Sequence, residues 1–262
     1  MYHFIFPSNV LNQKKVDETF QEEADFLKSK GVSFSLFNGE EILFKEDFIN
    51  KPIHSIYRGW MLNEWEYRNI EKQMLEKNIP LLSSVKSYFK SHYLDLYYNN
   101  IKDYTPNTLF SEPEEESLRE IYKNKNIKEK IFFIKDSVKS LTSKPNGEAS
   151  LSRSLEETLD IIEKIKKYKG KIEGKICIRE YIKFIDEERR YMVFKGKVFS
   201  NSNAPIPNCV YKAALKHKEN FFSVDVGVDI NGKEWIIEMG DGQVSDFYDK
   251  GWSIPEIYSP FI

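Results

Sequence analysis

Cysteine and histidine are scarce in this chain of 262 residues. Cys177 and Cys209 are its two cysteines, and the four histidines are scattered without the spacing of metal-binding motifs. Two distant cysteines do not make a disulfide framework, and the scattered histidines do not make a zinc site. We therefore expect reduced thiols, which are typical of the cytoplasm.

Long apolar runs are absent as well. No stretch approaches the roughly 20 apolar residues that a membrane-spanning helix needs. The N-terminal sequence MYHFIFPSN lacks the basic segment and the small-residue cleavage site of a secretory signal, so we expect a strand there. These features predict a cytoplasmic protein without a membrane partner.

Neither sign of charge is in excess. The 39 basic and 41 acidic residues leave a net charge of −2, which is too small to attract nucleic acid by bulk electrostatics. A nucleophile elbow and the Walker A, G-x-G-x-x-G, HExxH and CxxC motifs are all missing. With 40% hydrophobic residues, however, the chain can bury a large core in one or two domains, or in one domain built of lobes.

The first 105 residues alternate predicted strands and helices. The strands are predicted at Tyr2–Phe6, Val32–Phe37, His54–Tyr57 and Ile79–Leu82, and the helices at Asp17–Lys30, Tyr67–Asn78 and Ser87–Asn99. This alternation predicts an α/β lobe with a parallel sheet and ligands at the carboxyl ends of the strands. Arg58 directly follows one strand and is a candidate clamp for a substrate carboxylate, with a surface salt bridge as the alternative.

The rest of the chain predicts an α+β arrangement. Strands at Lys130–Ile134 and Lys175–Phe184 enclose a polar loop at 141–152, which we expect to be mobile, and a helix at 154–169 that opens with the capping box SLEE. A hairpin around Gly196 follows. Antiparallel strands therefore dominate late in the chain.

The stretch Phe222–Gly242 reads FSVDVGVDINGKEWIIEMGDG and predicts a β-hairpin. Asn231-Gly232 between two alternating runs is typical of a two-residue type I′ turn. That turn would place Asp225 opposite Glu238 and Asp229 opposite Glu234, with Ile236 on the same polar face. The other face is predicted to be core and to hold Val224, Val226, Val228, Ile230, Lys233, Trp235, Ile237 and Met239.

The predicted pairing of Asp225 with Glu238 brings two like charges together. Such a pair costs roughly 0.2–1 kcal/mol when exposed, and more when buried, unless something neutralises it. A divalent cation that also binds phosphates would do so. The alternative is a solvated polar face without a ligand, which is favoured for Asp229 and Glu234 beside the turn.

Basic residues supply candidate phosphate ligands. Lys135 and Lys139 flank the end of an apolar strand beside the polar loop, and Arg190 opens an interior strand. Each lysine suits a phosphate as a positive charge, whereas the arginine can point into a cleft as readily as to solvent. The alternatives are a surface lysine paired with Asp136 and, for Asp186 and its neighbours, a solvated turn.

Five segments in this order resemble the ATP-grasp superfamily, and most closely its clade named for one arginine and two lysines. The segments read IFFIKDSVKS, ICIREYI, EERRYMVFKGKVF, SVDVGVD and WIIEMGDGQVS. The preceding YRGWML and TPNT stretches resemble the pre-ATP-grasp region of that clade. The resemblance covers most of the chain from about Ile56 onward and implies a fold of class α/β plus α+β. It divides the chain into a pre-ATP-grasp lobe at 1–105 and ATP-grasp subdomains at 106–178 and 179–262.

The resemblance also implies a role for individual residues toward ATP and Mg²⁺. The implied roles are phosphate binding for Lys135, Lys139 and Arg190, adenine binding for the hinge of Glu180, Tyr181 and Ile182, ribose binding for Glu188, and Mg²⁺ binding for Asp225 and Glu238. Lys139 and Arg190 would also act in catalysis, and Arg189 replaces Arg190 if the register is off by one. Many family members have Asn where this chain has Gly240, which makes Asp241 the candidate third metal ligand, and many have Arg where it has Ser223.

The implied activity is ATP-dependent ligation of a carboxylate to an amine through an acylphosphate, with a small molecule, an amino acid or a peptide as substrate. Phosphoryl transfer needs positioning and charge stabilisation rather than a protein nucleophile. One alternative is a nucleotide-binding regulator or pseudo-enzyme of the same fold, which Gly240 and Ser223 motivate. The other is a protein-interaction module, which 15 Tyr and 19 Phe motivate, although many of these fall on predicted core faces.

Overall fold

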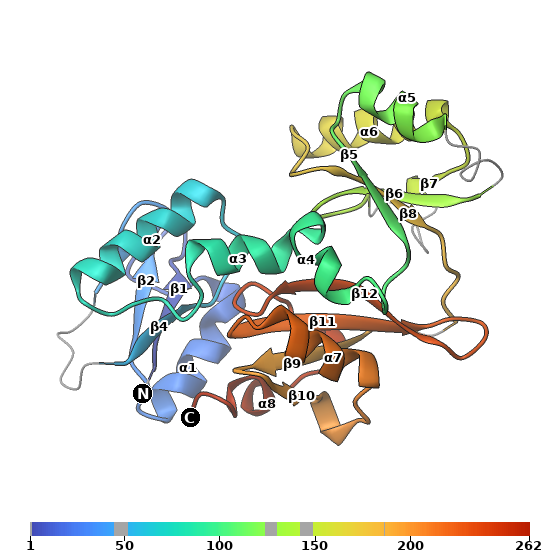
Figure 1. Cartoon of the computed structure of the whole chain (residues 1–262). Helices are drawn as coiled ribbons and strands as arrows, with labels where there is room; N and C mark the ends of the chain where they lie inside the picture. Colours follow the sequence, from blue (N-terminus) through green and yellow to red (C-terminus); the bar gives the residue numbers. More distant parts are fainter. Residues whose placement is uncertain (1, 45–51, 124–129, 142–148, 186) are drawn as a thin grey trace.

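The computed structural model describes residues 2–44, 52–123, 130–141, 149–185 and 187–262. Within them the chain forms three four-stranded sheets. Figure 1 shows three lobes, with the N-terminal sheet on the left, the C-terminal sheet below the centre and the central sheet at the upper right. Asp186 and most of the predicted mobile loop, residues 142–148, lie outside the described residues.

The N-terminal sheet has the order β3-β2-β1-β4, with β1 parallel to both of its neighbours and β3 antiparallel to β2. Helix α1 covers one face through Ala24 and Leu27, which pack on Phe4, and helix α2 covers the other through Ile70, which packs near Ile5. Since neighbouring residues of β1 point to opposite faces, both faces become core. The bounds are β1 Tyr2–Pro7, η1 Glu18–Phe20, α1 Gln21–Ser29, β2 Phe34–Phe37, β3 Ile42–Leu43, β4 His54–Tyr57 and α2 Glu64–Glu76.

Two helices connect this lobe to the rest of the molecule. They are α3 (Val85–His92) and α4 (Leu94–Ile101), which replace the single helix predicted at 87–99 because Tyr93 between them has an extended conformation. Helix α3 packs in the N-terminal core through Tyr88, whereas α4 packs in the C-terminal core through Tyr97. The strand predicted at 79–82 is reduced to one bridge, between Leu81 and Ser55.

The central sheet has the order β5-β8-β6-β7 and is antiparallel throughout. Helices α5 and α6 pack on one of its faces in a separate apolar core. Helix α6 begins and ends as predicted, with the Ser154 hydroxyl accepting from the amide of Glu157 and Gly170 in the left-handed conformation. Strand β5 was not predicted. The bounds are β5 Thr108–Ser111, α5 Glu115–Tyr122, β6 Phe132–Asp136, β7 Leu151–Ser152, α6 Leu155–Lys169 and β8 Ile176–Glu180.

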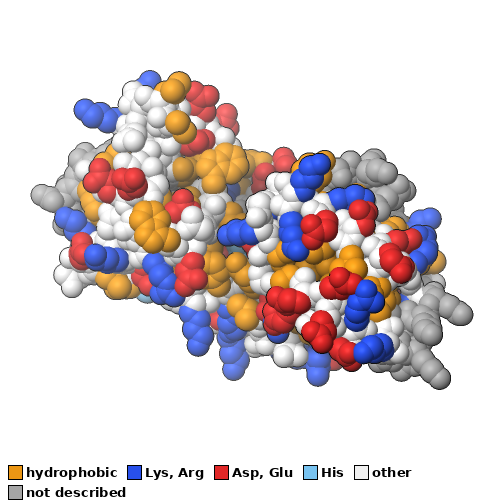
Figure 2. Space-filling view, turned by 90° about the horizontal axis from the view of Figure 1, so that it is seen from above, with side chains coloured by type: hydrophobic (Ala, Val, Ile, Leu, Met, Phe, Trp, Pro, Cys, Tyr) orange, Lys and Arg blue, Asp and Glu red, His pale blue; other side chains and the backbone are white. Residues whose placement is uncertain are grey.

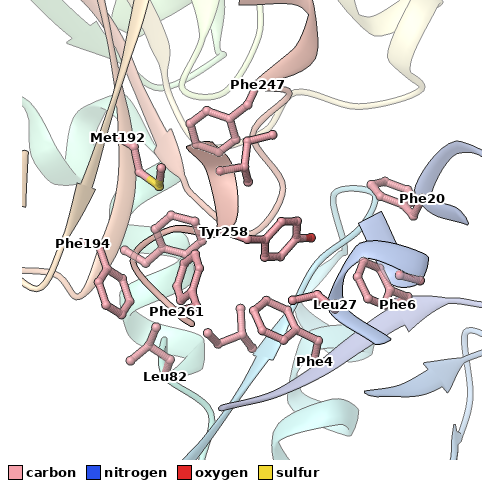
Figure 3. Close-up of a cluster of buried hydrophobic side chains, with 14 of the residues drawn as sticks. Phe4, Phe6, Phe20, Leu27, Leu82, Met192, Phe194, Phe247, Tyr258 and Phe261 are labelled. Carbon is pink, nitrogen blue, oxygen red and sulfur yellow. The ribbon is translucent and has the colours of Figure 1, made fainter. Parts of the chain in front are cut away.

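The C-terminal sheet has the order β10-β9-β11-β12 and is also antiparallel. Helix α7, which was not predicted, packs on one face, and the last residues of the chain pack on the other. Figure 3 shows Tyr258 and Phe261 between the N-terminal lobe, represented by Phe4 and Leu27, and Phe194 of the C-terminal sheet. The bounds are β9 Arg189–Phe194, β10 Lys197–Phe199, η4 Asn201–Asn203, α7 Asn208–His217, β11 Phe221–Val228, β12 Glu234–Asp241, η5 Tyr248–Lys250 and α8 Ile254–Tyr258.

The turn between β11 and β12 differs from the prediction. Gly232 has a φ of 78°, but Asn231 is not among the residues with positive φ, so the type I′ conformation is absent. The amide of Gly232 donates to Asp229, and the amide of Asp229 donates to Lys233. The loop therefore has three residues, a turn followed by a left-handed glycine. Positive φ at two consecutive residues occurs instead in the β9–β10 turn, at Lys195-Gly196.

This longer loop shifts the register near the turn by one residue, and a bulge restores it further along. Val226 pairs with Ile236, but Asp225 still pairs with Glu238, because the register changes between Asp225 and Val226. Ile236 is consequently buried in the C-terminal core, and Ile237 is not part of that core. The predicted faces of these two residues were wrong, whereas the opposition of Asp225 and Glu238 was right because two one-residue shifts cancel.

Two surface properties can be compared with the sequence. Among the described residues, no helix is both long enough and apolar enough to cross a membrane. On the face shown in Figure 2, acidic and basic side chains are interspersed over the lobes, in line with the small net charge.

Candidate active site

The candidate site is centred on the opposed carboxylates of Asp225 and Glu238. Arg190 on β9 lies opposite Asp225 on the other side of β11. Its guanidinium binds Asp225 through two hydrogen bonds, Nε to Oδ1 at 2.7 Å and Nη2 to Oδ2 at 2.6 Å. Only 6% of the Asp225 side chain and 16% of the Arg190 side chain are exposed, so this is a largely buried, bidentate ion pair.

Lys135 comes from the central sheet and binds the second carboxylate. Its Nζ lies 2.9 Å from Oε2 of Glu238 and 3.3 Å from the carbonyl oxygen of Val138. Desolvation opposes ionisation of Glu238, but the charge and the hydrogen bond of Lys135, together with the charges of Arg190 and Arg179, outweigh it and lower the pKa of Glu238. Lys135 is therefore no surface lysine paired with Asp136, which binds Lys169 instead.

Lys139 lies at the same end of β6 and is exposed. Its amide donates to Oδ1 of Asp136 at 2.7 Å, which holds the backbone of this segment close to the strand. Among the described residues, its ammonium forms no ion pair. Lys139 can therefore turn toward a phosphate at little cost.

The hinge and Glu188 lie where β8 leads into β9. The amides of Glu180 and Tyr181 donate to Asn107 and Ile131, so these two donors are already used. Glu188 is 41% exposed, with one carboxylate oxygen 3.4 Å from Nζ of Lys250. Desolvation and then the charge of Asp225 raise the pKa of Glu188.

Of the two consecutive arginines, Arg190 is the one at the carboxylate pair. Arg189 is exposed and lies opposite Val226 in the ladder. Because side chains alternate along a strand, only one of the two can share the face of Asp225. The structure thus places Arg190 at the site and Arg189 outside it.

Asp241 does not join the carboxylate pair. It lies three positions after Glu238 on the same strand and opposite Phe222, which puts its side chain on the other face of the sheet. Its Oδ1 accepts from the amide and the side chain of Gln243, and it is completely buried. In the described part of the chain, no group of three or more His, Cys, Asp or Glu side chains could hold a metal ion.

Arg58 is neither a free clamp nor a surface salt bridge. The residue is 4% exposed, and its guanidinium binds Glu23 through two hydrogen bonds of 2.8 Å. Its remaining donor reaches the carbonyl oxygens of Gln243 and Ser245. Both predictions for Arg58 were wrong, because the parallel sheet carries this residue into the interface with the C-terminal segment.

The sequence model of one protein family matches more than half of the chain. That family is described as an ATP-grasp domain, the third family of the clade named for one arginine and two lysines, and it matches residues 102–259. The chain belongs to this clade of the ATP-grasp superfamily. No curated protein matches the chain.

Solved structures of ATP-grasp proteins share the fold of almost the whole chain at low sequence identity. A RimK domain protein from Sphaerobacter thermophilus is 10% identical, covers 100% of this chain and 99% of its own, and has a TM-score of 0.60. D-alanyl-alanine synthetase A from Vibrio cholerae is 10% identical, with 98% and 96% covered and a TM-score of 0.58. The ATP-grasp ligase PsnB, in complex with a minimal precursor, Mg and ADP, is 12% identical, with 95% and 90% covered and a TM-score of 0.57.

These findings confirm the predicted superfamily, clade and fold. The family assignment also supports the predicted class of enzyme, an ATP-dependent ligase. The division at 105 and 178 stays a prediction. It is least clear for α4, which precedes residue 105 and yet packs against the C-terminal sheet.

The donor set of this ATP-grasp protein fits magnesium together with phosphates. Magnesium is usually held by one or two carboxylates, and phosphate oxygens and waters complete its shell. Asp225 and Glu238 supply the two carboxylates, so no third acidic ligand is required. Lys135 binds Glu238 and Arg190 binds Asp225, so both cations lie where the phosphates of a bound Mg²⁺ complex would meet them.

Hydroxyl groups surround the position where many ATP-grasp proteins have asparagine. A Cβ atom built on Gly240 would lie 3.2 Å from Oγ of Ser223 and 3.3 Å from Oγ of Ser245. These two hydroxyl oxygens are 2.7 Å apart. A side chain at 240 would therefore crowd these two hydroxyls, so the two departures, at 223 and 240, lie together in space.

Three residues that were not predicted bind the free edge of β12 in this ATP-grasp protein. Tyr97 accepts from the amide of Met239, His92 Nδ1 accepts from the amide of Asp241 at 2.9 Å, and Arg179 donates to the carbonyl of Ile236. Since Nδ1 of His92 accepts, the neutral ring carries its proton on Nε2. Burial lowers the pKa of His92 to about 4, so the ring is neutral. No pattern in the sequence pairs these side chains with β12.

Proposed function

We propose that this protein is an ATP- and Mg²⁺-dependent ligase that joins a carboxylate to an amine. The observation that carries the proposal is the opposed pair of Asp225 and Glu238 with Arg190 and Lys135 bound to it. In an ATP-grasp chain, these four side chains combine the carboxylates that a magnesium ion needs with the cations that a triphosphate needs.

Each residue has a role in this proposal. Asp225 and Glu238 hold Mg²⁺, whose charge neutralises the phosphate oxygens as the phosphoryl group transfers. Lys135, Lys139 and Arg190 bind phosphate oxygens. Adenine lies against the hinge of Glu180, Tyr181 and Ile182, and the ribose hydroxyls bind Glu188.

The reaction has two steps. An oxygen of the substrate carboxylate attacks the γ-phosphorus of ATP, and the bond to the β,γ-bridging oxygen breaks, which yields an acylphosphate and ADP. The amine then attacks the acyl carbon and loses a proton, and inorganic phosphate leaves. Arg190 and Lys139 stabilise the negative charge on the transferred group in both steps, so no protein nucleophile is needed.

An amino acid or a peptide is the proposed substrate. The names of similar structures include a D-alanyl-alanine synthetase and a macrocyclase bound to a precursor peptide. An amine and a carboxylate occur together in amino acids and peptides, which suits the reaction.

The first experiment is calorimetric titration of Mg·ATP into the wild type, Glu238→Ala and Glu234→Ala. Glu234 lies on the same strand next to the turn and serves as the matched control. We expect binding in the wild type and the control, and at least about tenfold weaker binding in Glu238→Ala, or about 1.4 kcal/mol. Absence of heat in the wild type would contradict the proposal.

A second measurement separates the enzyme from a regulator of the same fold. Pools of amino acids and short peptides are added with Mg·ATP, and the release of ADP is followed. An active ligase releases ADP with at least one pool. Tight binding without ADP release in any pool would favour the nucleotide-binding regulator, which Gly240 and Ser223 motivate.

A further inference from the structure

Both carboxylates of the proposed metal site already have cationic partners in the protein. Arg190 makes two hydrogen bonds to Asp225, and Lys135 makes one to Glu238. The four side chains carry two positive and two negative charges, which balance. The like-charge repulsion between opposed Asp225 and Glu238 is therefore relieved without a metal ion.

A metal ion that entered alone would upset this balance. Only 4% of the Lys135 side chain is exposed, and 16% of the Arg190 side chain. When a metal takes the carboxylates, these two cations lose their anionic partners. They keep only the carbonyl oxygens of Val138 and Asp246 and lie next to a further positive charge. A largely buried charge without a partner is unfavourable, so binding of the metal alone is opposed.

A triphosphate that entered alone meets the reverse problem. Its oxygens attract Lys135 and Arg190 away from the carboxylates, and Asp225 and Glu238 are then left opposite each other without a counter-charge. When both ligands enter, each cation moves from a carboxylate to a phosphate and each carboxylate moves from a cation to the metal. All charges are then paired again.

We infer that Lys135 and Arg190 are resident counter-ions that occupy the metal site until phosphates draw them off, so that metal and nucleotide bind as one unit. This inference rests on the proposed function and adds that the metal ion binds well only together with the nucleotide. The two cations then have a second role besides phosphate binding, which is to suppress metal binding in the absence of nucleotide.

The two counter-ions are held in different ways. Arg190 is fixed within its own lobe, since it also donates to the carbonyl of Asp246 and its own carbonyl accepts from Trp252. Lys135 reaches Glu238 from the central sheet, so this ion pair links two lobes. When Lys135 exchanges Glu238 for a phosphate, the direct contact between the two lobes is replaced by a contact through the nucleotide. When Arg190 exchanges Asp225 for a phosphate, only contacts within the C-terminal lobe change.

The test measures metal binding without nucleotide. Mn²⁺ is titrated into the wild type, Lys135→Met, Arg190→Gln and Lys139→Met, and free Mn²⁺ is followed by electron paramagnetic resonance. We expect weak binding in the wild type and at least about tenfold tighter binding in Lys135→Met and in Arg190→Gln. Lys139 is not paired with either carboxylate, so Lys139→Met should bind Mn²⁺ like the wild type. Mg·ADP should bind more weakly to all three variants.

The double variant Lys135→Met with Glu238→Gln locates the effect. If the gain in Mn²⁺ affinity arises at the carboxylate, the double variant loses it. Mn²⁺ binding that is equal in the wild type, Lys135→Met and Arg190→Gln overturns the inference, as does a gain that persists in the double variant. Thermal unfolding of each variant verifies that it is folded, and the two single variants report on the inference independently.

The same titrations separate this inference from the proposed function. If wild type binds Mg·ADP but Mn²⁺ affinity does not change in the variants, the inference fails and the proposed function stands. If wild type does not bind Mg·ADP, the proposed function fails, whatever the Mn²⁺ titrations give.

Discussion

Charged residues in this protein differ in whether they are exposed to solvent and in whether they have an ionic partner. Lys139 is exposed, and its side chain has no anionic partner among the described residues. Arg58 is buried with Glu23, which also accepts from the hydroxyl of Tyr258. The first arrangement leaves a side chain available to a ligand, and the second fixes a side chain in the interior. The position of Arg58 after a parallel strand does not by itself decide between these two arrangements.

Replacement of Arg58 tests whether its role is structural. Arg58→Met leaves the carboxylate of Glu23 buried without its main partner, and we expect a loss of about 3–5 kcal/mol in the free energy of unfolding. The double variant Arg58→Met with Glu23→Leu removes both charges and should recover most of that loss. Urea denaturation measures both. A single variant as stable as the wild type would contradict the structural role.

Elements of the C-terminal sheet are adjusted by single residues that break the regular pattern. The three-residue loop after β11 and the bulge near Asp225 each shift the register by one residue. Without the bulge, the longer loop would place Ile237 rather than Glu238 opposite Asp225. The two irregularities therefore belong together, and both are needed for the candidate site.

The turn between β11 and β12 can be tested by two alanine substitutions. Gly232 has positive φ, so Gly232→Ala should lower the free energy of unfolding by about 1–2 kcal/mol. Asn231 has no positive φ, so Asn231→Ala should cost much less. A type I′ turn would instead require positive φ at both positions. Equal losses in urea denaturation of the two variants would contradict the observed loop.

At the scale of the whole molecule, the apolar cores and the contacts between lobes decide stability. One core joins the N-terminal sheet to the C-terminal sheet through Tyr258 and Phe261 (Figure 3). Another joins α4 to α7 and to the C-terminal sheet. His217 lies in the second region, where Ser91 and Asn100 bind its two ring nitrogens.

Burial of His217 predicts a dependence of stability on pH. Desolvation lowers the pKa of His217 from 6.5 to about 4. Between these values the unfolded chain binds the proton and the folded chain does not, so stability falls as the pH falls through 6.5 toward 4. His217→Gln cannot bind the proton and should lose less stability than wild type between pH 7 and pH 5, by up to about 2 kcal/mol. Urea denaturation at both pH values measures this, and an equal loss would contradict the prediction.

Several features were determined by the sequence alone. The period of two along β11 and β12 predicts that Asp225 lies opposite Glu238 across a two-residue loop, and the bulge keeps that opposition although the loop has three residues. The order of the segments identifies the superfamily, since each motif is local and keeps its place in the chain. Strand alternation also separates Asp241 from Glu238, and the analogy with the family's third ligand was wrong for that reason.

Only the tertiary structure decided which charges meet. Lys135 binds Glu238 across 103 positions of the chain, and Arg58 binds Glu23 across 35. Such pairs depend on how the sheets are oriented relative to each other, which local periodicity does not specify. The hydrogen bonds of His92 and Arg179 to the free edge of β12 likewise depend on the packing of distant elements. Local patterns fix the direction of a side chain, but the packing of distant elements chooses its partner.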